Sequence, residues 1–156
     1  MAWYNRGDMR EGRGSESERQ RGETKLNKII VQLKKDYPWL RWRLGKKFAF
    51  RPPRTIVVEQ EKLDECSKML LLHEVGHAML EHQNYRTDVE RLKMERAAWE
   101  QARKLCERYG VEYDVEVAER ELDSYRDWLH RRASCPRCGL TRYQGADGEY
   151  HCPECG

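Results

Sequence analysis

Two short cysteine knuckles near the carboxyl end constrain the fold of this chain more than any other feature. The stretches CPRCG and CPECG place Cys135, Cys138, Cys152 and Cys155 in two C-x-x-C pairs, separated by residues 139–151. A glycine after each second cysteine permits the backbone turn that directs amide N–H groups at a thiolate sulfur. Four thiolates at this spacing can form a closed tetrahedral site, so we expect one structural zinc ion, with iron as the minor alternative.

The segment between the knuckles, LTRYQGADGEYH, predicts a β-hairpin that turns at residues 145–148. Residues 132–156 as a whole resemble a zinc ribbon. Such modules bind nucleic acid, bind protein or cap a fold, and the sequence leaves these three roles open. His151, next to Cys152, is interpreted as a surface residue.

A second group of candidate metal ligands lies in LLLHEVGHAML, residues 70–80. The apolar residues follow a helical period, which predicts a helix over residues 63–81. At about 100° per residue, His77 lies roughly 40° from His73, and Glu74 lies roughly 100° from it. Two imidazoles one turn apart can bind one zinc ion, while the adjacent glutamate is offset enough to hold a water molecule. Ordinary surface or core histidines are the alternative.

The next predicted helix, residues 88–109, offers a third ligand. Glu95 falls in the middle of its apolar stripe, where a lone carboxylate must be paired, protonated or bound to metal. A salt bridge to a buried arginine or a hydrogen bond to the backbone is the alternative. His82 lies about 180° around the first helix and could coordinate only if that helix ended first. A metzincin pattern is disfavoured because it requires glycine and histidine where Leu80 and Gln83 stand.

HEVGHAMLEH followed by ERAAWEQA resembles the ImmA/IrrE-type group of small gluzincin metallopeptidases over residues 55–109. The resemblance implies that His73, His77 and Glu95 bind a catalytic zinc ion and that Glu74 is the catalytic base. It also implies a small mixed sheet whose edge strand flanks the cleft.

The sequence differs from two related families at specific positions. Ala97 and Trp99 stand where the ImmA/IrrE-type group often has acidic or amide residues, which could orient a ligating histidine. SprT-like proteases also combine such a centre with a zinc ribbon. They are less similar, because their third ligand is a histidine in a His-Gly motif that is absent here.

The chemistry expected of this centre is hydrolysis of peptide bonds. A zinc ion activates water and polarises the scissile carbonyl, and Glu74 transfers the proton to the leaving amine. The substrate is expected to add as an extended strand to the predicted strand RTIVVEQ, along Thr55, Ile56, Val57, Val58 and Glu59. The donor that stabilises the oxyanion stays open among Tyr85, Tyr109, Tyr113 and Tyr125.

Charge is distributed unevenly along the chain. Residues 1–24 hold five arginines and five acids and almost no aliphatic side chains, which predicts a disordered tail. Residues 25–54 hold ten lysines and arginines, one acid and several aromatic residues, whereas residues 59–129 are net acidic. A basic aromatic segment can neutralise phosphates and stack on bases, so nucleic acid is a candidate partner through residues 25–54 and the ribbon. A solvated basic face with core aromatics is the alternative.

Membrane and disulfide chemistry are not expected. No window approaches about 18 uninterrupted apolar residues, and the amino terminus has no apolar signal core, which favours a cytoplasmic protein. Paired C-x-x-C knuckles in such a protein indicate metal rather than disulfides. The two remaining cysteines, Cys66 and Cys106, are expected to be buried reduced thiols.

The sequence therefore predicts an α+β fold. It consists of a gluzincin-like domain over residues 25–131, with a small mixed sheet and a helical carboxyl-terminal half, followed by a four-cysteine zinc ribbon over residues 132–156. The expected activity is that of a zinc metallopeptidase acting on an intracellular protein. A protein associated with DNA is one candidate substrate. The competing hypothesis is a non-catalytic adaptor that binds nucleic acid or protein through the ribbon. Glu74 favours catalysis, because a structural zinc site needs no carboxylate there.

Overall fold

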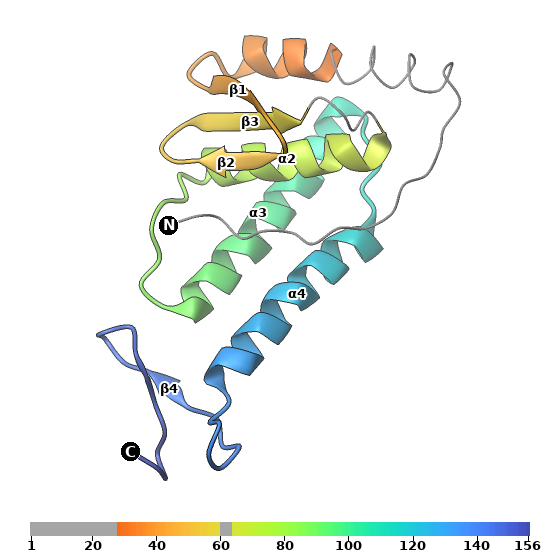
Figure 1. Cartoon of the computed structure of the whole chain (residues 1–156). Coiled ribbons are helices and arrows are strands. Elements are labelled where there is room, and N and C mark those ends of the chain that lie inside the picture. Colours follow the sequence, from red (N-terminus) through yellow and green to blue (C-terminus); the bar gives the residue numbers. More distant parts are fainter. Residues whose placement is uncertain (1–27, 60–63) are drawn as a thin grey trace.

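The computed structural model describes residues 28–59 and 64–156. The predicted tail, residues 1–24, lies outside these described residues. In Figure 1 a small sheet and the first helix lie at one end of the molecule, and the carboxyl-terminal hairpin lies at the other, with two long helices between them. The architecture is mixed α+β, as the sequence predicts. None of the described helices is long and apolar enough to cross a bilayer.

The first helix extends over residues 28–36 of the described chain. Ile29, Leu33 and Tyr37 are buried at a spacing of four residues, so one face of the helix packs into the core. Pro38 follows directly, and the residue before a proline is disfavoured in helical conformation, which explains the end of the helix.

Three strands form a mixed sheet in the order β1-β3-β2. β1 is Arg41–Gly45, β2 is Ala49–Arg51 and β3 is Thr55–Glu59. β3 pairs in parallel with β1 and antiparallel with β2. The expectation that a substrate adds along Thr55, Ile56, Val57, Val58 and Glu59 is wrong for the first three residues, because they pair with a strand on both sides. Val58 and Glu59 pair with β1 alone.

α2, Glu65–Met79, contacts β2 and β3 on one side and α3 on the other. The sequence predicted this helix over residues 63–81. Asp64 caps its amino terminus by accepting a hydrogen bond from the Ser67 N–H at 2.8 Å. Nearly every side chain from Ser67 to Ala78 is buried, so α2 is the central element of the core.

α3, Asp88–Tyr109, has the bounds that the sequence predicts. Thr87 and Glu90 form a capping box at its start, and Gly110 ends it in the left-handed conformation, φ 64°. α4, Val115–Ala133, begins after the cap residue Asp114 and extends past the expected domain boundary at residue 131.

The carboxyl-terminal hairpin pairs β4, Tyr143–Gln144, with β5, Tyr150–His151, in antiparallel fashion. Its turn spans residues 145–148, where the Gly148 N–H donates to the Gly145 carbonyl at 3.0 Å. The turn lies where the sequence predicts it. α4 ends at Ala133, and the first cysteine knuckle follows directly.

Candidate metal centres

Three side chains from two helices meet inside the core and form a His-His-Glu group. The Nε2 atoms of His73 and His77 lie 3.1 Å apart. Glu95 Oε2 lies 3.3 Å from the first nitrogen and 3.4 Å from the second. All three residues are buried, with exposed fractions of 1%, 2% and 2%. The structure therefore brings together the two histidines of α2 and the glutamate of α3 that the sequence singled out.

The spacing of these donors fits a small divalent metal ion. Ligands about 2.0–2.1 Å from a tetrahedral centre lie roughly 3.3 Å from one another, which matches the three observed separations. Glu95 Oε2 is buried and has no hydrogen-bond partner of good geometry among the described residues. An unpartnered carboxylate oxygen in the core is strongly unfavourable, and a cation held between the three donor atoms would compensate its charge.

Gly76 allows the two helices to approach closely enough for this geometry. A β-carbon at Gly76 would lie 2.8 Å from the Ala98 carbonyl oxygen, closer than such atoms pack. Because Ala98 is three residues after Glu95 on α3, the contact sets the separation of the two helices beside the donors. The glycine within His-Glu-x-Gly-His is thus part of the architecture of the site.

The charge states suit metal binding. Burial lowers the pKa of His73, so its imidazole is neutral at physiological pH and can donate a lone pair. Burial also opposes ionisation of Glu95, but polar contact and charge from His73 and His77 outweigh it and hold the pKa of this carboxyl well below its usual range. The cluster therefore presents the neutral imidazole of His73 and the ionised carboxylate of Glu95 beside His77.

The second nitrogen of His77 has a partner that the sequence did not predict. His82 Nδ1 lies 2.8 Å from His77 Nδ1. α2 ends at Met79, and Glu81 adopts a positive φ of 53°, which turns His82 back towards the helix. Burial lowers the pKa of His82 to about 4, so it is neutral. His82 therefore contacts His77 and is not one of the three donor residues.

His73 is oriented by packing instead. The ring of Trp99 stacks on the imidazole, with centroids 4.0 Å apart and an interplanar angle of 28°. His73 Nδ1 and Trp99 Nε1 are both buried without a hydrogen-bond partner among the described residues. Trp99 therefore fills the space beside His73 with an aromatic ring.

Glu74 lies next to the centre and is held by the sheet. Its Oε2 accepts a hydrogen bond from the Phe50 main-chain N–H at 2.7 Å. The ring of Phe50 lies parallel to that of His77, with centroids 6.3 Å apart. Glu74 is 7% exposed. β2 therefore covers the face of α2 that carries the histidine-glutamate motif.

All four candidate tyrosines contact other groups. The Tyr109 hydroxyl donates to Asp36 Oδ2 at 2.7 Å, and the Tyr113 hydroxyl lies 3.5 Å from the Trp99 carbonyl oxygen. The Tyr85 hydroxyl accepts from Arg91, whose guanidinium also lies over the Tyr125 ring. No described contact brings any of the four hydroxyls to the histidines.

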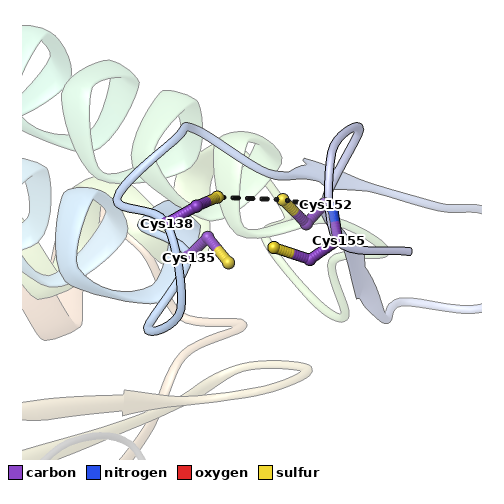
Figure 2. A group of neighbouring side chains, drawn as sticks. All are labelled: Cys135, Cys138, Cys152 and Cys155. Atoms are coloured by element: carbon purple, nitrogen blue, oxygen red, sulfur yellow. Dashed lines mark hydrogen bonds between the residues drawn. The ribbon is translucent and has the colours of Figure 1, made fainter.

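The four knuckle cysteines form the second centre (Figure 2). The sulfur atoms of Cys135, Cys138, Cys152 and Cys155 lie within 4.8 Å of one another. The Cys155 N–H points at Cys152 Sγ, 3.4 Å away. Hydrogen bonds from the main-chain N–H groups of Cys138 and Arg137 lower the pKa of Cys135 to about 6. These amides favour the thiolate of Cys135, and the four clustered sulfur atoms are suited to hold a metal ion.

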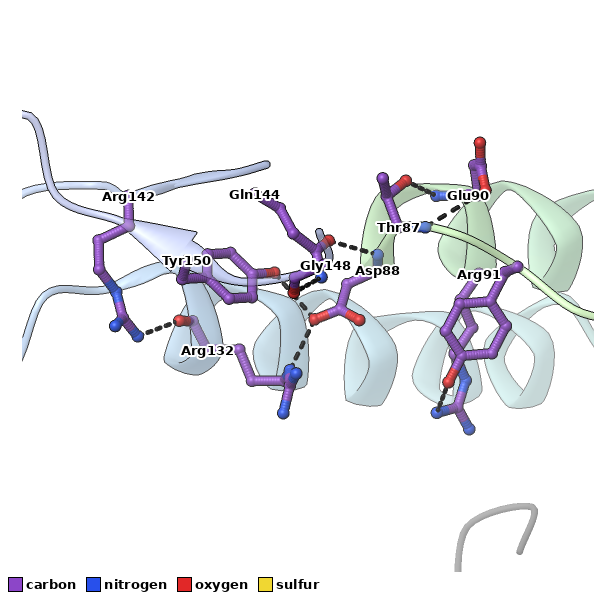
Figure 3. Close-up of polar contacts among 10 residues, drawn as sticks. Thr87, Asp88, Glu90, Arg91, Arg132, Arg142, Gln144, Gly148 and Tyr150 are labelled. Carbon is purple, nitrogen blue, oxygen red and sulfur yellow. Dashed lines mark hydrogen bonds and ion pairs between the residues drawn. The ribbon is translucent and has the colours of Figure 1, made fainter. Parts of the chain in front are cut away.

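A buried carboxylate fastens this module to the start of α3 (Figure 3). Asp88 Oδ2 accepts hydrogen bonds from Arg132 Nε at 2.6 Å and from the Tyr150 hydroxyl at 2.9 Å. The Asp88 main-chain N–H donates to Gln144 Oε1 at 2.7 Å. Residues from α4, β4 and β5 thus converge on one residue of α3, and no local pattern in the sequence indicates this contact.

The two remaining cysteines differ from each other. Cys106 is buried, as expected, and burial raises the pKa of its thiol to about 11. Cys66 is exposed in the first turn of α2, so the expectation that it is buried is wrong. The apolar residues of α2 begin after it, and the helical period therefore could not place it reliably.

Comparisons with known protein families, with curated proteins and with solved structures found no match for this chain.

Proposed function

We propose that the protein is a zinc-dependent metallopeptidase of the gluzincin type, similar to the ImmA/IrrE-type group. The observation that carries the proposal is the meeting of His73 Nε2, His77 Nε2 and Glu95 Oε2 at tetrahedral spacing, with Glu74 adjacent. Two histidines and one glutamate are a donor set that catalytic zinc sites use, with one position left for water or substrate. The four cysteines would hold a second, structural zinc ion.

His73, His77 and Glu95 would hold the zinc ion, which would supply Lewis-acid chemistry for polarising the scissile carbonyl and activating water. Glu74 accepts the proton of the attacking water and delivers it to the leaving amine. The Phe50 N–H holds one oxygen of this carboxylate in place. His82 orients His77 through its second ring nitrogen, and Trp99 packs on the ring of His73.

The substrate class is an extended segment of a protein. β2 is an edge strand, and its Phe50 N–H reaches the catalytic base, so this strand flanks the proposed cleft. A peptide that pairs with β2 would replace the expected pairing with β3. Because Glu74 and the histidines are buried, β2 must shift for a peptide to reach them. Four reduced, metal-binding cysteines fit a cytoplasmic location and an intracellular substrate.

The catalytic role of Glu74 is tested by the substitution Glu74→Gln. The variant should keep both zinc ions and lose cleavage of a quenched fluorescent casein, because the amide cannot accept the proton. Glu81→Gln, which changes an exposed glutamate at the end of the same helix, is the matched control and should retain activity. A Glu74→Gln variant that cleaves casein as fast as the unaltered protein would contradict the proposal.

A non-catalytic adaptor is the second candidate, and two observations favour it. The His-His-Glu group is fully buried beneath β2, as a structural site would be. A hollow of about 510 Å³ lies instead between α3, α4 and the ribbon, where Leu92, Leu129 and Tyr143 line it. A hydroxamate added to the Co²⁺-substituted protein separates the two hypotheses. A change in the visible spectrum indicates an accessible coordination position and supports the peptidase, whereas an unchanged spectrum supports the adaptor.

A further inference from the structure

The sheet has one face packed against the helices and one face directed away from them. Along β3, Ile56 and Val58 are buried in the core, while Thr55 and Val57 alternate with them and are half-buried. Side chains of adjacent residues in a strand project to opposite faces. Thr55 and Val57 therefore mark the outer face of the sheet.

The strand register places three arginines on that outer face. Thr55 pairs with Arg41 of β1 and with Arg51 of β2, so the two arginines flank it in one row. Val57 pairs with Arg43 and Ala49 in the next row. Paired residues in neighbouring strands project to the same side. Arg41, Arg43 and Arg51 thus surround a patch of three small or medium side chains, Ala49, Thr55 and Val57.

These arginines are available for binding. All three are exposed, and none forms an ion pair with any residue that the structure describes. Arg41 and Arg43 lie about 7 Å apart along their strand, since each residue adds roughly 3.3 Å. Glu59, at the far end of β3, is the one acid in the three strands.

Further positive charge borders the same sheet. Exposed Lys46 and Lys47 follow β1 in the loop to β2. Exposed Arg54 precedes β3, and its carbonyl accepts a hydrogen bond from the Arg41 N–H at 2.8 Å. Most of the excess charge of residues 25–54 is therefore concentrated on one sheet and its loops, whereas Tyr37 and Phe50 from the same segment are in the core.

We propose that this outer sheet face, formed by Arg41, Arg43, Arg51 and their neighbours, binds the phosphodiester backbone of nucleic acid. The planar guanidinium group of arginine matches the geometry of phosphate oxygens and can form two parallel hydrogen bonds. The uncharged residues of the face are small, so it offers a flat surface to a charged chain. The large apolar side chain of β1, Leu44, is exposed but pairs with buried Val58, so it does not belong to the outer row of Arg41 and Arg43. Trp39, two residues before Arg41, contacts the Tyr37 ring edge-on and is 42% exposed, which leaves part of its ring free to stack on an unpaired base.

The test measures binding of the full chain to a fluorescein-labelled oligo-dT strand and to a matched duplex, by fluorescence anisotropy from about 50 to 200 mM NaCl. The triple variant Arg41→Gln, Arg43→Gln, Arg51→Gln should weaken binding to both. It should also lower the slope of log affinity against log salt by about 2 for the single strand, roughly 0.7 per phosphate contact. Trp39→Ala should weaken binding of the oligo-dT strand alone.

The matched control removes three exposed charges from α3, through Lys93→Gln, Arg103→Gln and Lys104→Gln. It should leave affinity and slope close to those of the unaltered protein. Thermal midpoints and zinc content that are equal in both triple variants ensure that the fold is intact. An equal loss of affinity in the control, or no DNA binding by the unaltered protein at about 50 mM salt, would overturn the proposal.

A control with lipid vesicles distinguishes binding to nucleic acid from binding to an anionic membrane surface. Vesicles of phosphatidylcholine and phosphatidylserine should not co-sediment with the protein. Arginine-dependent co-sedimentation with these vesicles, in the absence of DNA binding, would assign the face to a membrane and overturn the proposal. None of these readouts depends on peptidase activity, so the outcome is independent of the proposed function.

Discussion

Gly76 of α2 faces the carbonyl oxygen of Ala98 on α3, and a β-carbon at Gly76 would lie 2.8 Å from that oxygen. The two helices carry all three donors of the His-His-Glu group. Their separation at this point therefore controls whether Glu95 reaches the two imidazoles. A clash with backbone cannot be relieved by rotating a side chain, so the helices themselves would have to move apart.

The substitution Gly76→Ala should weaken both folding and metal binding. Overpacking at this contact is expected to lower the free energy of unfolding by about 1–3 kcal/mol. Helix propensity alone predicts the opposite effect, because alanine in place of glycine raises the free energy of unfolding by about 1 kcal/mol. Urea unfolding therefore discriminates between the two effects, and a more stable Gly76→Ala protein would show that the helices do not need this close approach.

His82 should tune the affinity of the His-His-Glu group for metal. Its ring contacts the second nitrogen of His77, and loss of such a partner typically weakens metal binding by about 10–100-fold. We expect a loss in that range for His82→Ala, measured by competition with a chromogenic zinc chelator. His130→Ala, which changes a histidine of α4 outside both centres, is the control and should bind zinc like the unaltered protein. An affinity that does not change in His82→Ala would mean that the contact has no orienting role.

The Asp88 anchor should contribute measurably to stability. Asp88 is buried and accepts two hydrogen bonds, one of them from a guanidinium group. Removing these bonds with Asp88→Ala should lower the free energy of unfolding by roughly 1.5–3 kcal/mol. Asp123→Ala breaks an ion pair of comparable length with Arg126, but both of those side chains are largely exposed, so the loss should stay below about 1 kcal/mol. If chemical denaturation shows that the two substitutions lower the free energy of unfolding equally, Asp88 has no special role.

Acid should weaken the contact between the first helix and α3. The Tyr109 hydroxyl donates to Asp36 and lowers the pKa of this carboxyl below its usual 3.8. A depressed pKa in the folded state means that the contribution to stability is present above about pH 4 and is lost as pH falls through the folded value. Asp36→Asn should flatten the fall in thermal midpoint below about pH 4. The exposed control Asp127→Asn should retain the slope of the unaltered protein.

Features that depend on neighbouring residues, such as helix ends and the spacing of metal ligands, were predictable from the sequence. The bounds of α3 follow from the Thr87 capping box and from Gly110, and both lie within a few residues of the helix ends. The three donors follow from helical geometry, because His73 and His77 share a face of α2 and Glu95 interrupts an apolar stripe. The spacing of the four knuckle cysteines is enough to predict that they form one cluster.

Features that depend on distant parts of the chain were missed. β2 has three residues, too few for a detectable alternation, and it makes β3 the central strand instead of an edge. The contact of His82 with His77 depends on the left-handed turn at Glu81, whereas a helical projection assumes an unbroken helix. The link from Asp88 to Tyr150 joins residues far apart in sequence, so no local pattern encodes it.

The metal content of purified variants tests the central claim most directly. The unaltered protein should contain two zinc ions per chain. Glu95→Ala should retain about one, and Glu100→Ala, an exposed glutamate on the same helix, should retain two. The double variant Cys135→Ser, Cys138→Ser should also retain about one. A Glu95→Ala protein that keeps two zinc ions with undiminished affinity would contradict the assignment of His73, His77 and Glu95 as one metal centre.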